Sequence, residues 1–458
     1  ANVVHLECHY LMDDLPSLSA IKARRGNLST FDTVQELHEN LRNPEQQDPL
    51  RALCDVARMI GQRGGLSRED FLHSQAAWKQ IVDHYLTHVT EPSFIDYFWS
   101  VRNIHAPLFL LASIAQKLPK GRCLHAISTG YAGFLGALAH HIHHLPFAIT
   151  EHGIYTKERQ IDLLEAKWIK TSTDALSHGF QIHTGYLRQM WIRFFQGLGR
   201  MTYASASHIT TLHEGNRLRQ IQDGAEKART RIIPNGIQIE RFAPLRSATA
   251  HNQQPIVALL GRVTPIKDIK TFIRAMRQLI SQVPDAQGWI VGPDSEDPAY
   301  AQECRDLVQQ LGVEKQVRFL GFQRTEEILA QVRLVVLTSI SEAQPLVVLE
   351  AMAAGIPVVC SDVGACRELV TGDATRQQAA GQIVPIANPM ATAHAMEQLL
   401  TQPARWLDAR AAGIARVEAD YTEALMMARY LQLYDEVMYP DALPMTAAAR
   451  LFTALGRR

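Results

Sequence analysis

The sequence has no long hydrophobic run and no start that resembles an export signal. No stretch approaches the roughly 18 consecutive apolar residues of a membrane-spanning helix. The residues after Ala1 do not form a basic stretch followed by an apolar core. We therefore expect a cytoplasmic protein without direct membrane insertion. Because residue 1 is Ala rather than Met, we also expect that the sequence begins inside a longer natural chain.

The sequence also lacks an excess of charge and a pattern of paired cysteines. Lys plus Arg and Asp plus Glu each total 46, so no overall field attracts nucleic acid or an anionic membrane surface. Any anion must therefore be bound by a local group of cations. The cysteines have neither metal-binding nor paired spacing, which favours reduced, buried thiols; they are Cys8, Cys54, Cys123, Cys304, Cys360 and Cys366.

The length and the order of the apolar segments predict more than one α/β domain. A chain of 458 residues exceeds the roughly 100–200 residues of a typical domain. From residue 255 onward, apolar strands alternate with amphipathic helices, which predicts a Rossmann-like domain with a parallel sheet covered on both faces. The predicted strands are 256–260, 288–291, 317–320, 334–337 and 357–360, and the predicted helices are 269–283, 300–311, 326–331 and 346–354.

The first half of the chain is less regular and fits a second α/β domain with a helical insertion. Its helical patterns cover 67–88, 94–118 and 158–200, and its short strands cover 122–127, 146–150, 209–212 and 231–233. The polar segment 243–254 is the predicted linker. We therefore predict an N-terminal domain over 1–245, a C-terminal domain over 246–425, and C-terminal helices over 426–458 that return toward the first domain.

The segment from Leu337 to Pro357 has the pattern of an anion-binding strand, loop and helix. Pro345 stands near the first helical turn, where its missing N–H costs nothing, and Gly355 followed by Pro357 ends the helix. The free amides at the helix start, together with the helix dipole, suit a diphosphate. In parallel sheets, ligands bind at this carboxyl edge of the strands.

Two carboxylates stand beside this predicted anion site: Glu342 in the loop and Glu350 in the helix. Carboxylates repel phosphate unless they face neutral hydroxyls, which a nucleotide sugar carries on both sides of its diphosphate. The segment resembles the donor site of retaining glycosyltransferase family 4, a GT-B family. The resemblance implies that Glu350 binds ribose hydroxyls and that Glu342 contacts the transferred sugar. The usual glycine after the first glutamate is Ala343 here.

A second motif, Gly261 to Asp268, places two cations just after a predicted strand. Gly261 permits a tight exit, Arg262 offers a planar fork and Lys267 a point charge, and together the two cations would neutralise a leaving diphosphate. The resemblance assigns them that catalytic role. Further expected donor contacts are Gly292, Pro293, Gly321 and Phe322 around the nucleoside and Ala343, Gln344, Pro345 and Leu346 at the helix start, while Ile233-Pro234-Asn235-Gly236 is expected to end the first domain.

In the first half, ionisable side chains follow an apolar strand over Phe147 to Arg159. A strand end facing a cleft suits sugar contacts, and a histidine near the anomeric carbon can hydrogen-bond donor hydroxyls. We therefore predict a catalytic role for His152. The segment and the helical region before it resemble the Pel-type glycosyltransferases of bacterial exopolysaccharide synthesis. Acceptor or sugar contacts are expected from Glu151, Tyr155, Lys157 and Arg159.

Two further features of the first half are less specific. The segment His125 to Gly136 is a strand that enters a glycine-spaced helix start, so either Ser128 and Gly130 contact phosphate or acceptor, or the glycines serve helix packing. The histidines at 140, 141, 143 and 144 point in different directions without a completing acid or cysteine, so we expect no metal there. The opening strand and Gly-Gly loop usual in family 4 have no match before Asn27.

The resemblance implies a GT-B fold in which two Rossmann-like domains face a cleft, with a helical insertion in the first and a C-terminal crossover helix. It implies retaining, metal-independent transfer of a hexose or N-acetylhexosamine from a UDP-sugar to a growing exopolysaccharide, without a cofactor. The expected partners are a polysaccharide acceptor and inner-membrane synthase or export proteins that recruit the chain to the inner membrane. Two alternatives stay open, a nucleotide-sugar-sensing or scaffold subunit of a synthase complex and a UDP-sugar epimerase. Glucose, N-acetylglucosamine and N-acetylgalactosamine all stay open as the sugar.

Overall fold

The computed structural model describes residues 75–89, 92–118, 121–165, 185–251, 254–372 and 378–440, together with Cys54 and Ala57. The chain divides into two compact units. The first comprises Ala1–Thr210, Arg219–Arg231 and Gln432–Arg458, and the second comprises Thr211–Leu218 and Ile232–Leu431. No helix within the described ranges combines the length and apolar composition that crossing a bilayer requires. The predicted segments before residue 54, and residues 166–184 of the predicted helix 158–200, lie outside the described residues.

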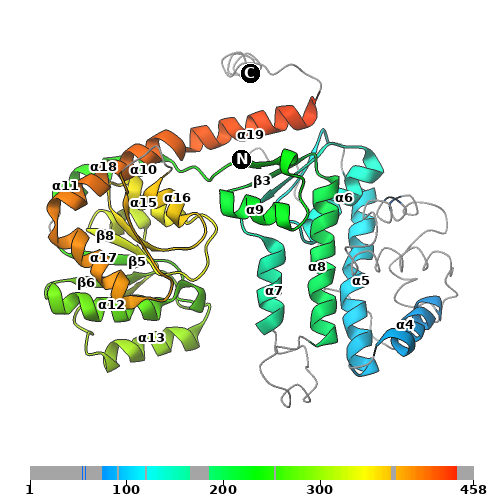
Figure 1. Ribbon diagram of the computed structural model, residues 1–458, viewed down its shortest axis with the longest axis horizontal. Coiled ribbons are helices and arrows are strands. Elements are labelled where there is room, and N and C mark those ends of the chain that lie inside the picture. Colours follow the sequence, from blue (N-terminus) through cyan, green and yellow to red (C-terminus); the bar gives the residue numbers. More distant parts are fainter. Residues whose placement is uncertain are drawn as a thin grey trace. The chain divides into compact units, whose positions relative to one another are not determined.

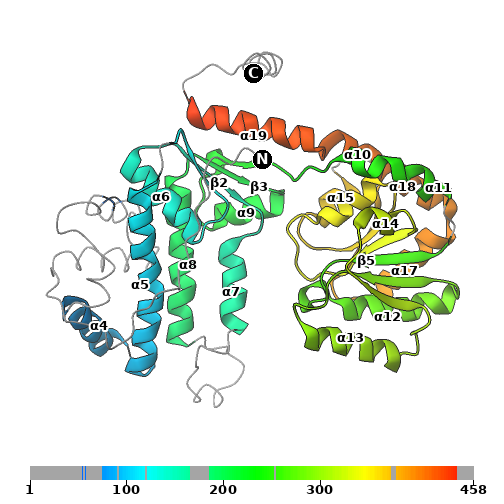
Figure 2. The same ribbon diagram turned by 180° about the vertical axis from the view of Figure 1, so that it is seen from behind.

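The first unit is built on a four-stranded sheet of order β1-β2-β3-β4, in which β1 and β2 are parallel. Apolar side chains of the sheet, including Phe147, Ile149 and Ile209, pack against α5, α6 and α8 in one core, and these three helices lie side by side in Figures 1 and 2. The strands are β1 (Leu124–Ala126), β2 (Phe147–Glu151), β3 (His208–Thr211) and β4 (Thr230–Ile232), and the helices are α4 (Gln75–His88), α5 (Phe94–Gln116), α6 (Tyr131–His143), α7 (Tyr155–Glu165), α8 (Tyr186–Ser205) and α9 (Glu214–Gln222). The residues of α9 up to Leu218 belong to the second unit.

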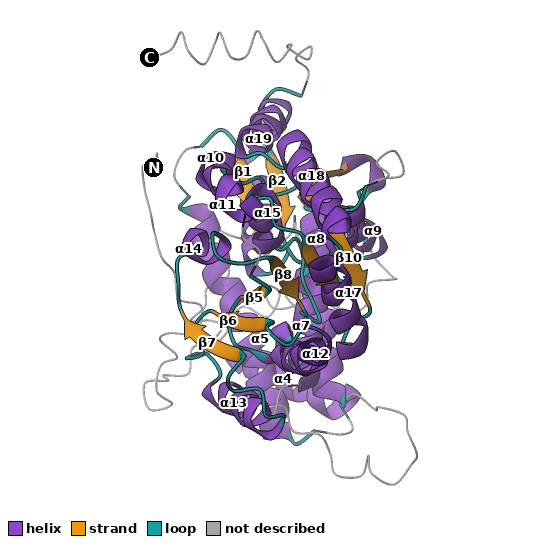
Figure 3. Cartoon of the chain, turned by 90° about the vertical axis from the view of Figure 1, so that its left-hand side faces the viewer, coloured by secondary structure: helices purple, strands orange, loops and turns teal. Residues whose placement is uncertain are grey.

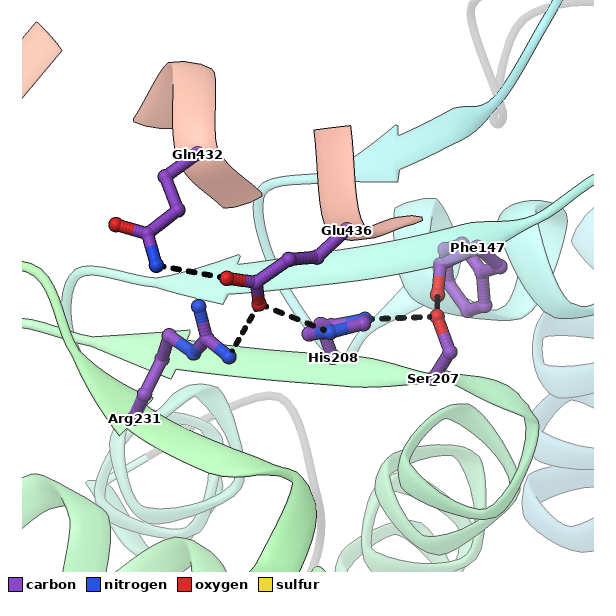
Figure 4. Close-up of polar contacts among 6 residues, drawn as sticks. All are labelled: Phe147, Ser207, His208, Arg231, Gln432 and Glu436. Atoms are coloured by element: carbon purple, nitrogen blue, oxygen red, sulfur yellow. Dashed lines mark hydrogen bonds and ion pairs between the residues drawn. The ribbon is translucent and has the colours of Figure 1, made fainter. Parts of the chain in front are cut away.

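A polar network holds the end of the long C-terminal helix α19 (Glu423–Met438) on this sheet. Figure 4 shows Glu436 accepting a hydrogen bond from Arg231 at 2.7 Å and lying 3.6 Å from His208 Nε2. Two residues earlier, Tyr434 Oη lies 2.7 Å from Nδ1 of His125. Because these partners stand on β1, β3 and β4, the helix is fixed across the sheet rather than at one edge. The predicted C-terminal helix is therefore present, and its residues from Gln432 onward belong to the first unit.

The second unit is built on a six-stranded parallel sheet of order β10-β9-β8-β5-β6-β7. One hydrophobic core lies between the sheet and α12, α13 and α17, and another between the sheet and α14, α15 and α16; Figure 3 shows the strands between helices. The strands are β5 (Ile256–Leu260), β6 (Gln287–Val291), β7 (Val317–Gly321), β8 (Leu334–Leu337), β9 (Val358–Ser361) and β10 (Gly381–Val384). The helices are α10 (Ile239–Phe242), α11 (Arg246–His251), α12 (Ile269–Gln282), α13 (Pro298–Gln310), α14 (Thr325–Leu329), α15 (Leu346–Ala353), α16 (Cys366–Thr371), α17 (Pro389–Thr401) and α18 (Pro403–Asp420).

The strand order of this sheet places two loops side by side. From β5 the chain proceeds outward through β6 and β7, then returns to form β8 on the other side of β5, where Val257 pairs with Leu334. The strand order therefore reverses between β5 and β8. At such a switch point the loops at the carboxyl ends of the two strands form a crevice that suits a ligand.

The predicted linker is wrong, because most of it is helical and packed on the second unit. Residues Ala243–Leu245 form a 3₁₀ turn that leads into α11, and the buried Thr249 donates its hydroxyl to Ala354 O at 2.9 Å. Ile237 and Phe242 lie in the core of the second unit. The continuous part of the second unit therefore begins at Ile232 rather than at 246.

Candidate active site

The most buried ion pair of the second unit joins the two loops at the switch point. Lys267 Nζ, after β5, lies 2.5 Å from Glu342 Oε1, after β8, and their side chains are 19% and 13% exposed. The loop carrying Lys267 is also held to the β8 loop by its backbone, since Ile340 N donates to Ile266 O at 2.9 Å. Lys267 and Glu342, two of the three residues predicted to be catalytic in this unit, thus occupy one site.

The glycines predicted to contact the donor tie neighbouring strand ends together. Gly261 N donates to Val291 O at 2.8 Å, and Gly292 N donates to Gly321 O at 2.9 Å. Gly292 has a φ of +148°, and a Cβ there would overlap the carbonyl of Gly261. Only glycine permits this close approach. Pro293 accepts from Val263 N at 2.9 Å, so the loops after β5, β6 and β7 form one backbone-lined edge.

The segment after Glu342 forms the predicted helix start, which is the N-terminus of α15. Pro345 caps α15 and no side chain bonds the free amides of its first turn. Leu346 is exposed, whereas Gln344 is buried and its Oε1 accepts from Asn235 N at 2.6 Å. The side chain of Gln344 therefore holds the turn at Pro234 and Asn235, and its predicted contact with the donor stays a prediction.

Arg262 does not share the partner of Lys267. Its guanidinium donates to Glu296 at 2.7 Å, and these side chains are 54% and 51% exposed. An ion pair this exposed is weak, on the order of 0–1 kcal/mol, so Arg262 can leave Glu296 for a bound anion at little cost. Phe322, after β7, is 79% exposed and offers a ring face at the same edge of the sheet.

Glu350 lies beside a second pair of charges. Burial raises the pKa of the Glu350 carboxyl, nearby Arg241 opposes the rise and Glu326 adds to it. Arg241 and Glu326 bond each other at 2.6 Å, and the sequence does not reveal this pair because the two residues stand in α10 and α14, far apart along the chain. A half-buried carboxylate of this kind suits paired hydroxyls, such as those of a ribose.

Gly364 is a site residue that the sequence did not reveal. It has a φ of +52°, and a Cβ would lie 2.5 Å from Ala343 O and overlap the carbonyl of Glu342. Its neighbour Ala365 donates its N–H to Ala343 O at 2.8 Å. The loop carrying Glu342 therefore rests directly on the backbone of Gly364.

This contact leads to a first prediction. Gly364→Ala is expected to displace the Glu342 loop and weaken nucleotide-sugar binding about tenfold or more, since strain of this kind costs about 1–3 kcal/mol. Gly312→Ala is the matched control, because Gly312 also has a positive φ, +64°, but its Cβ would meet nothing within 4 Å. Isothermal titration calorimetry checks both variants, and equal affinities would contradict the role of Gly364.

In the first unit, the predicted sugar contact by Glu151 is wrong. Its side chain is fully buried and accepts hydrogen bonds from Thr129 at 2.7 Å, Tyr203 at 2.5 Å and Gln220 at 3.0 Å. Burial raises the pKa of Glu151, and these hydrogen bonds, with one from the Tyr155 backbone, oppose the rise. Glu151 is thus an internal tie between β2, α7, α8, α9 and the loop before α6.

The other predicted residues of the first unit divide into exposed and packed groups. His152, Lys157 and Arg159 are exposed, so their predicted roles stay predictions. Gly130 lies under the ring of Tyr155, where a Cβ would overlap the ring, which favours packing over ligand contact for this glycine. Ser128 is half-buried, and its carbonyl lies against Gly133.

No group of three or more His, Cys, Asp or Glu side chains among the described residues is arranged to hold a metal ion. The histidines of α6 have other partners: His140 Nδ1 lies 2.6 Å from Leu145 O and His143 Nε2 lies 2.6 Å from Ala115 O. Burial lowers the pKa of His141 to about 4, with further lowering from His140 and His144.

Comparison with known proteins follows the same division of the chain. Residues 254–402 match the family model "Glycosyl transferases group 1", and residues 1–228 match "Domain of unknown function (DUF3492)". D-inositol 3-phosphate glycosyltransferase of Nocardia farcinica is 30% identical over 36% of this chain and 39% of its own length. The GDP-mannose-dependent monoacylated alpha-(1-6)-phosphatidylinositol monomannoside mannosyltransferase of Corynebacterium glutamicum is 29% identical over 42% and 53%. The chain thus spans about half or less of these relatives.

Two solved structures share the architecture across most of the chain. Anabaena HepE in complex with UDP and glucose has a TM-score of 0.56 and 21% identity, covering 72% of this chain and 83% of its own. Sucrose-phosphate synthase from Thermosynechococcus elongatus has a TM-score of 0.56 and 22% identity, covering 74% and 79%.

The fold is therefore GT-B, with a Rossmann-like α/β sheet in each unit, as the sequence predicted. More particularly, residues 254–402 match the model of the glycosyl transferases group 1 family. This match agrees with the predicted resemblance to family 4, and the Pel-type assignment stays a prediction.

Proposed function

We propose that this chain is a retaining glycosyltransferase that moves a hexose or N-acetylhexosamine from a UDP-sugar to a growing exopolysaccharide. The observation that carries the proposal is the Lys267–Glu342 ion pair, 2.5 Å long, at the switch point of a group 1 domain and beside the uncapped start of α15. A cation, a carboxylate and free amides at one edge match a diphosphate joined to a sugar.

In the proposed reaction, the bond between the sugar C1 and the phosphate oxygen breaks, and its electron pair goes to that oxygen. The acceptor hydroxyl oxygen bonds to C1 on the same face, and its proton passes to the leaving phosphate. Lys267, Arg262 and the first amides of α15 stabilise the charge on that phosphate, which is the main catalytic contribution. Glu342 binds sugar hydroxyls and Glu350 binds the ribose.

The ion pair between Lys267 and Glu342 in the ligand-free chain is consistent with the proposed binding of phosphate by Lys267 and of sugar by Glu342. Without donor, each charge is satisfied by the other at low solvent exposure. An arriving donor supplies a phosphate for Lys267 and hydroxyls for Glu342, so neither charge is left unpaired when the pair separates. Unpaired buried charges are costly, and this exchange avoids that cost.

Product analysis with radiolabelled UDP-sugar tests the proposal against its alternatives. We expect label in a polymer or oligosaccharide. A donor whose sugar has changed would instead indicate an epimerase, and binding without turnover would indicate a sensor or scaffold subunit. Retention follows if the product has the anomeric configuration of the donor.

The identity of the nucleotide base in the donor is tested separately. HepE, which shares the fold, was solved with UDP and glucose, whereas the Corynebacterium glutamicum relative is named for GDP-mannose. A thermal-shift screen of UDP-, GDP- and ADP-sugars is expected to give the largest stabilisation with a UDP-sugar. A larger response to a GDP-sugar would overturn the choice of UDP.

We also predict that turnover needs no divalent metal ion. Lys267, Arg262 and the α15 amides already supply positive charge for a diphosphate, so EDTA is expected to leave the transfer rate unchanged. The check is the initial rate with EDTA, and with EDTA followed by excess magnesium. A rate that falls with EDTA and returns with magnesium would refute this prediction.

The biological setting belongs to the same proposal. The segment from Thr150 to Arg159 supports a Pel-type exopolysaccharide as product, with cytoplasmic localisation and recruitment by inner-membrane synthase or export proteins. Co-purification of the chain with membranes from cells that contain or lack such a synthase tests the recruitment.

A further inference from the structure

The loop that carries Glu342 is held by hydroxyl groups that no part of the proposed reaction uses. The ladder between β8 and β9 ends at the pair Leu337 and Cys360. One residue beyond that end, Ser361 Oγ donates to Ser339 O at 2.5 Å. The serine side chain thereby extends the contact between the two strands past the last backbone pair, and it fixes the backbone from which the Glu342 loop departs.

Ser339 in turn holds the carboxylate itself. Its Oγ donates to Glu342 Oε1 at 2.7 Å, and Lys267 Nζ lies 2.5 Å from the same oxygen. Among the described residues, Oε2 of Glu342 makes no hydrogen bond. One oxygen is therefore held twice and the other is left as an acceptor.

Both serines are almost completely buried, with 1% of Ser339 and 2% of Ser361 exposed. Neither can bind solvent or a large ligand directly. A buried hydroxyl aimed at a carboxylate restricts its rotation, and a hydrogen bond to a charged group is about twice as strong as a neutral one. This geometry suits a group that must meet a sugar hydroxyl in one orientation.

We propose that Ser339 is a positioning residue for sugar recognition, which acts by fixing Glu342 Oε1 so that Oε2 faces the donor sugar, and that Ser361 supports it through the Ser339 carbonyl. The proposal rests on the proposed function, since it assumes that Glu342 binds the sugar. When donor draws Lys267 toward its phosphate, Ser339 remains as the group that keeps the carboxylate in place.

The test separates sugar recognition from nucleotide binding. UDP and UDP-glucose, UDP-N-acetylglucosamine and UDP-N-acetylgalactosamine are titrated into the whole chain by calorimetry, and the tightest UDP-sugar is compared with UDP. Ser339→Ala is expected to weaken that UDP-sugar about tenfold, the effect of one charge-assisted hydrogen bond, while the Kd of UDP changes by less than about twofold. Ser361→Ala is expected to act in the same direction with a smaller effect.

Thr392→Val is the matched control for the loss of a buried hydroxyl. Thr392 is 1% exposed in the same unit and donates to Asn388 O at 2.8 Å, within α17 and its cap. This variant is expected to bind both ligands as the wild type does. Equal weakening of UDP and UDP-sugar by Ser339→Ala would indicate a general structural role and overturn the positioning role.

A double-mutant cycle tests whether Ser339 acts through Glu342. In the Glu342→Ala background, which removes the acceptor of the Ser339 hydroxyl, Ser339→Ala is expected to change UDP-sugar affinity by less than about twofold, because coupled residues are not additive. Full additivity would refute the proposal while leaving the proposed function intact. A wild-type chain that binds no nucleotide sugar would instead refute the proposed function itself.

Discussion

Replacing Lys267 with Ala is expected to lower kcat/KM for sugar transfer by about 100- to 1,000-fold, the usual effect of removing one preorganised group that stabilises a developing charge. Lys267 lies at the switch point and only 19% of its side chain is exposed, so bulk water cannot replace its charge on the leaving phosphate. Its loss also leaves Glu342 beside an incoming diphosphate without a counter-charge. The loss should therefore appear in both donor binding and turnover, measured as KM and kcat.

Lys270→Ala is the matched control for this prediction. Lys270 stands three residues later and also pairs with a glutamate, with Nζ 2.6 Å from Glu303 Oε2, but Glu303 is 59% exposed. Removal of such an exposed pair is worth about 1 kcal/mol or less, and the residue lies outside the proposed donor contacts. Its transfer rate should match the wild type. A Lys267→Ala enzyme that transfers at the wild-type rate would show that this cation does not stabilise the leaving group.

The donor site could be predicted largely because its signals are local. A strand, a tight glycine exit, a proline at a helix start and a glycine at its end all occur within a few residues, and each has its own physical reason. The strands β5, β6, β7, β8 and β9 formed close to their predicted positions for the same reason. The pairing of Lys267 with Glu342, 75 residues apart, depends instead on the order of strands in the sheet, which no local sequence pattern reveals.

The rest could not be predicted because it depends on contacts between distant segments. Gly364 looks like any loop glycine until the Glu342 loop lies on it. The segment 243–254 is polar enough for a linker, and contacts with distant residues, such as the bond from Arg410 to Arg246 O at 2.7 Å, show that it packs on the second unit. Composition alone does not distinguish a solvated segment from one whose polar groups have partners.

Glu151 is a second residue whose environment depends on contacts between distant segments, which its sequence motif does not reveal. A charged residue at the end of an apolar strand usually indicates a ligand site, and its neighbour His152 is indeed exposed. The strand β2 ends at Glu151 and all five of its residues are buried, whereas His152 stands in the bend that follows the strand. Substitution of the buried Glu151 should therefore change the stability of the first unit, whereas substitution of the exposed His152 should not.

Glu151→Ala is expected to destabilise the first unit by about 3 kcal/mol or more. The variant leaves the hydroxyls of Thr129 and Tyr203 and the amide of Gln220 without their acceptor in a buried space, at about 1–3 kcal/mol for each unsatisfied group. Thermal unfolding should shift down by roughly 6–10 °C for a unit of this size. Gln382→Ala, which removes a part-buried side-chain hydrogen bond in the second unit, is expected to shift it far less.

The dependence on pH separates the Glu151 charge from its hydrogen bonds, with Glu151→Gln as the comparison. Because the pKa of Glu151 is raised in the folded chain, the folded state holds this proton more tightly than the unfolded state. The contribution of this protonated carboxyl to the free energy of unfolding is complete below the pKa of the unfolded state, near 4.3 for a glutamate. It is lost as the pH rises through the higher pKa of the folded state. The stability advantage of the wild type over Glu151→Gln should therefore be largest in acid and shrink toward neutral pH, as measured by denaturant unfolding across that range. An advantage that grows with pH would show that the hydrogen-bond donors outweigh burial and hold Glu151 ionised in the folded chain.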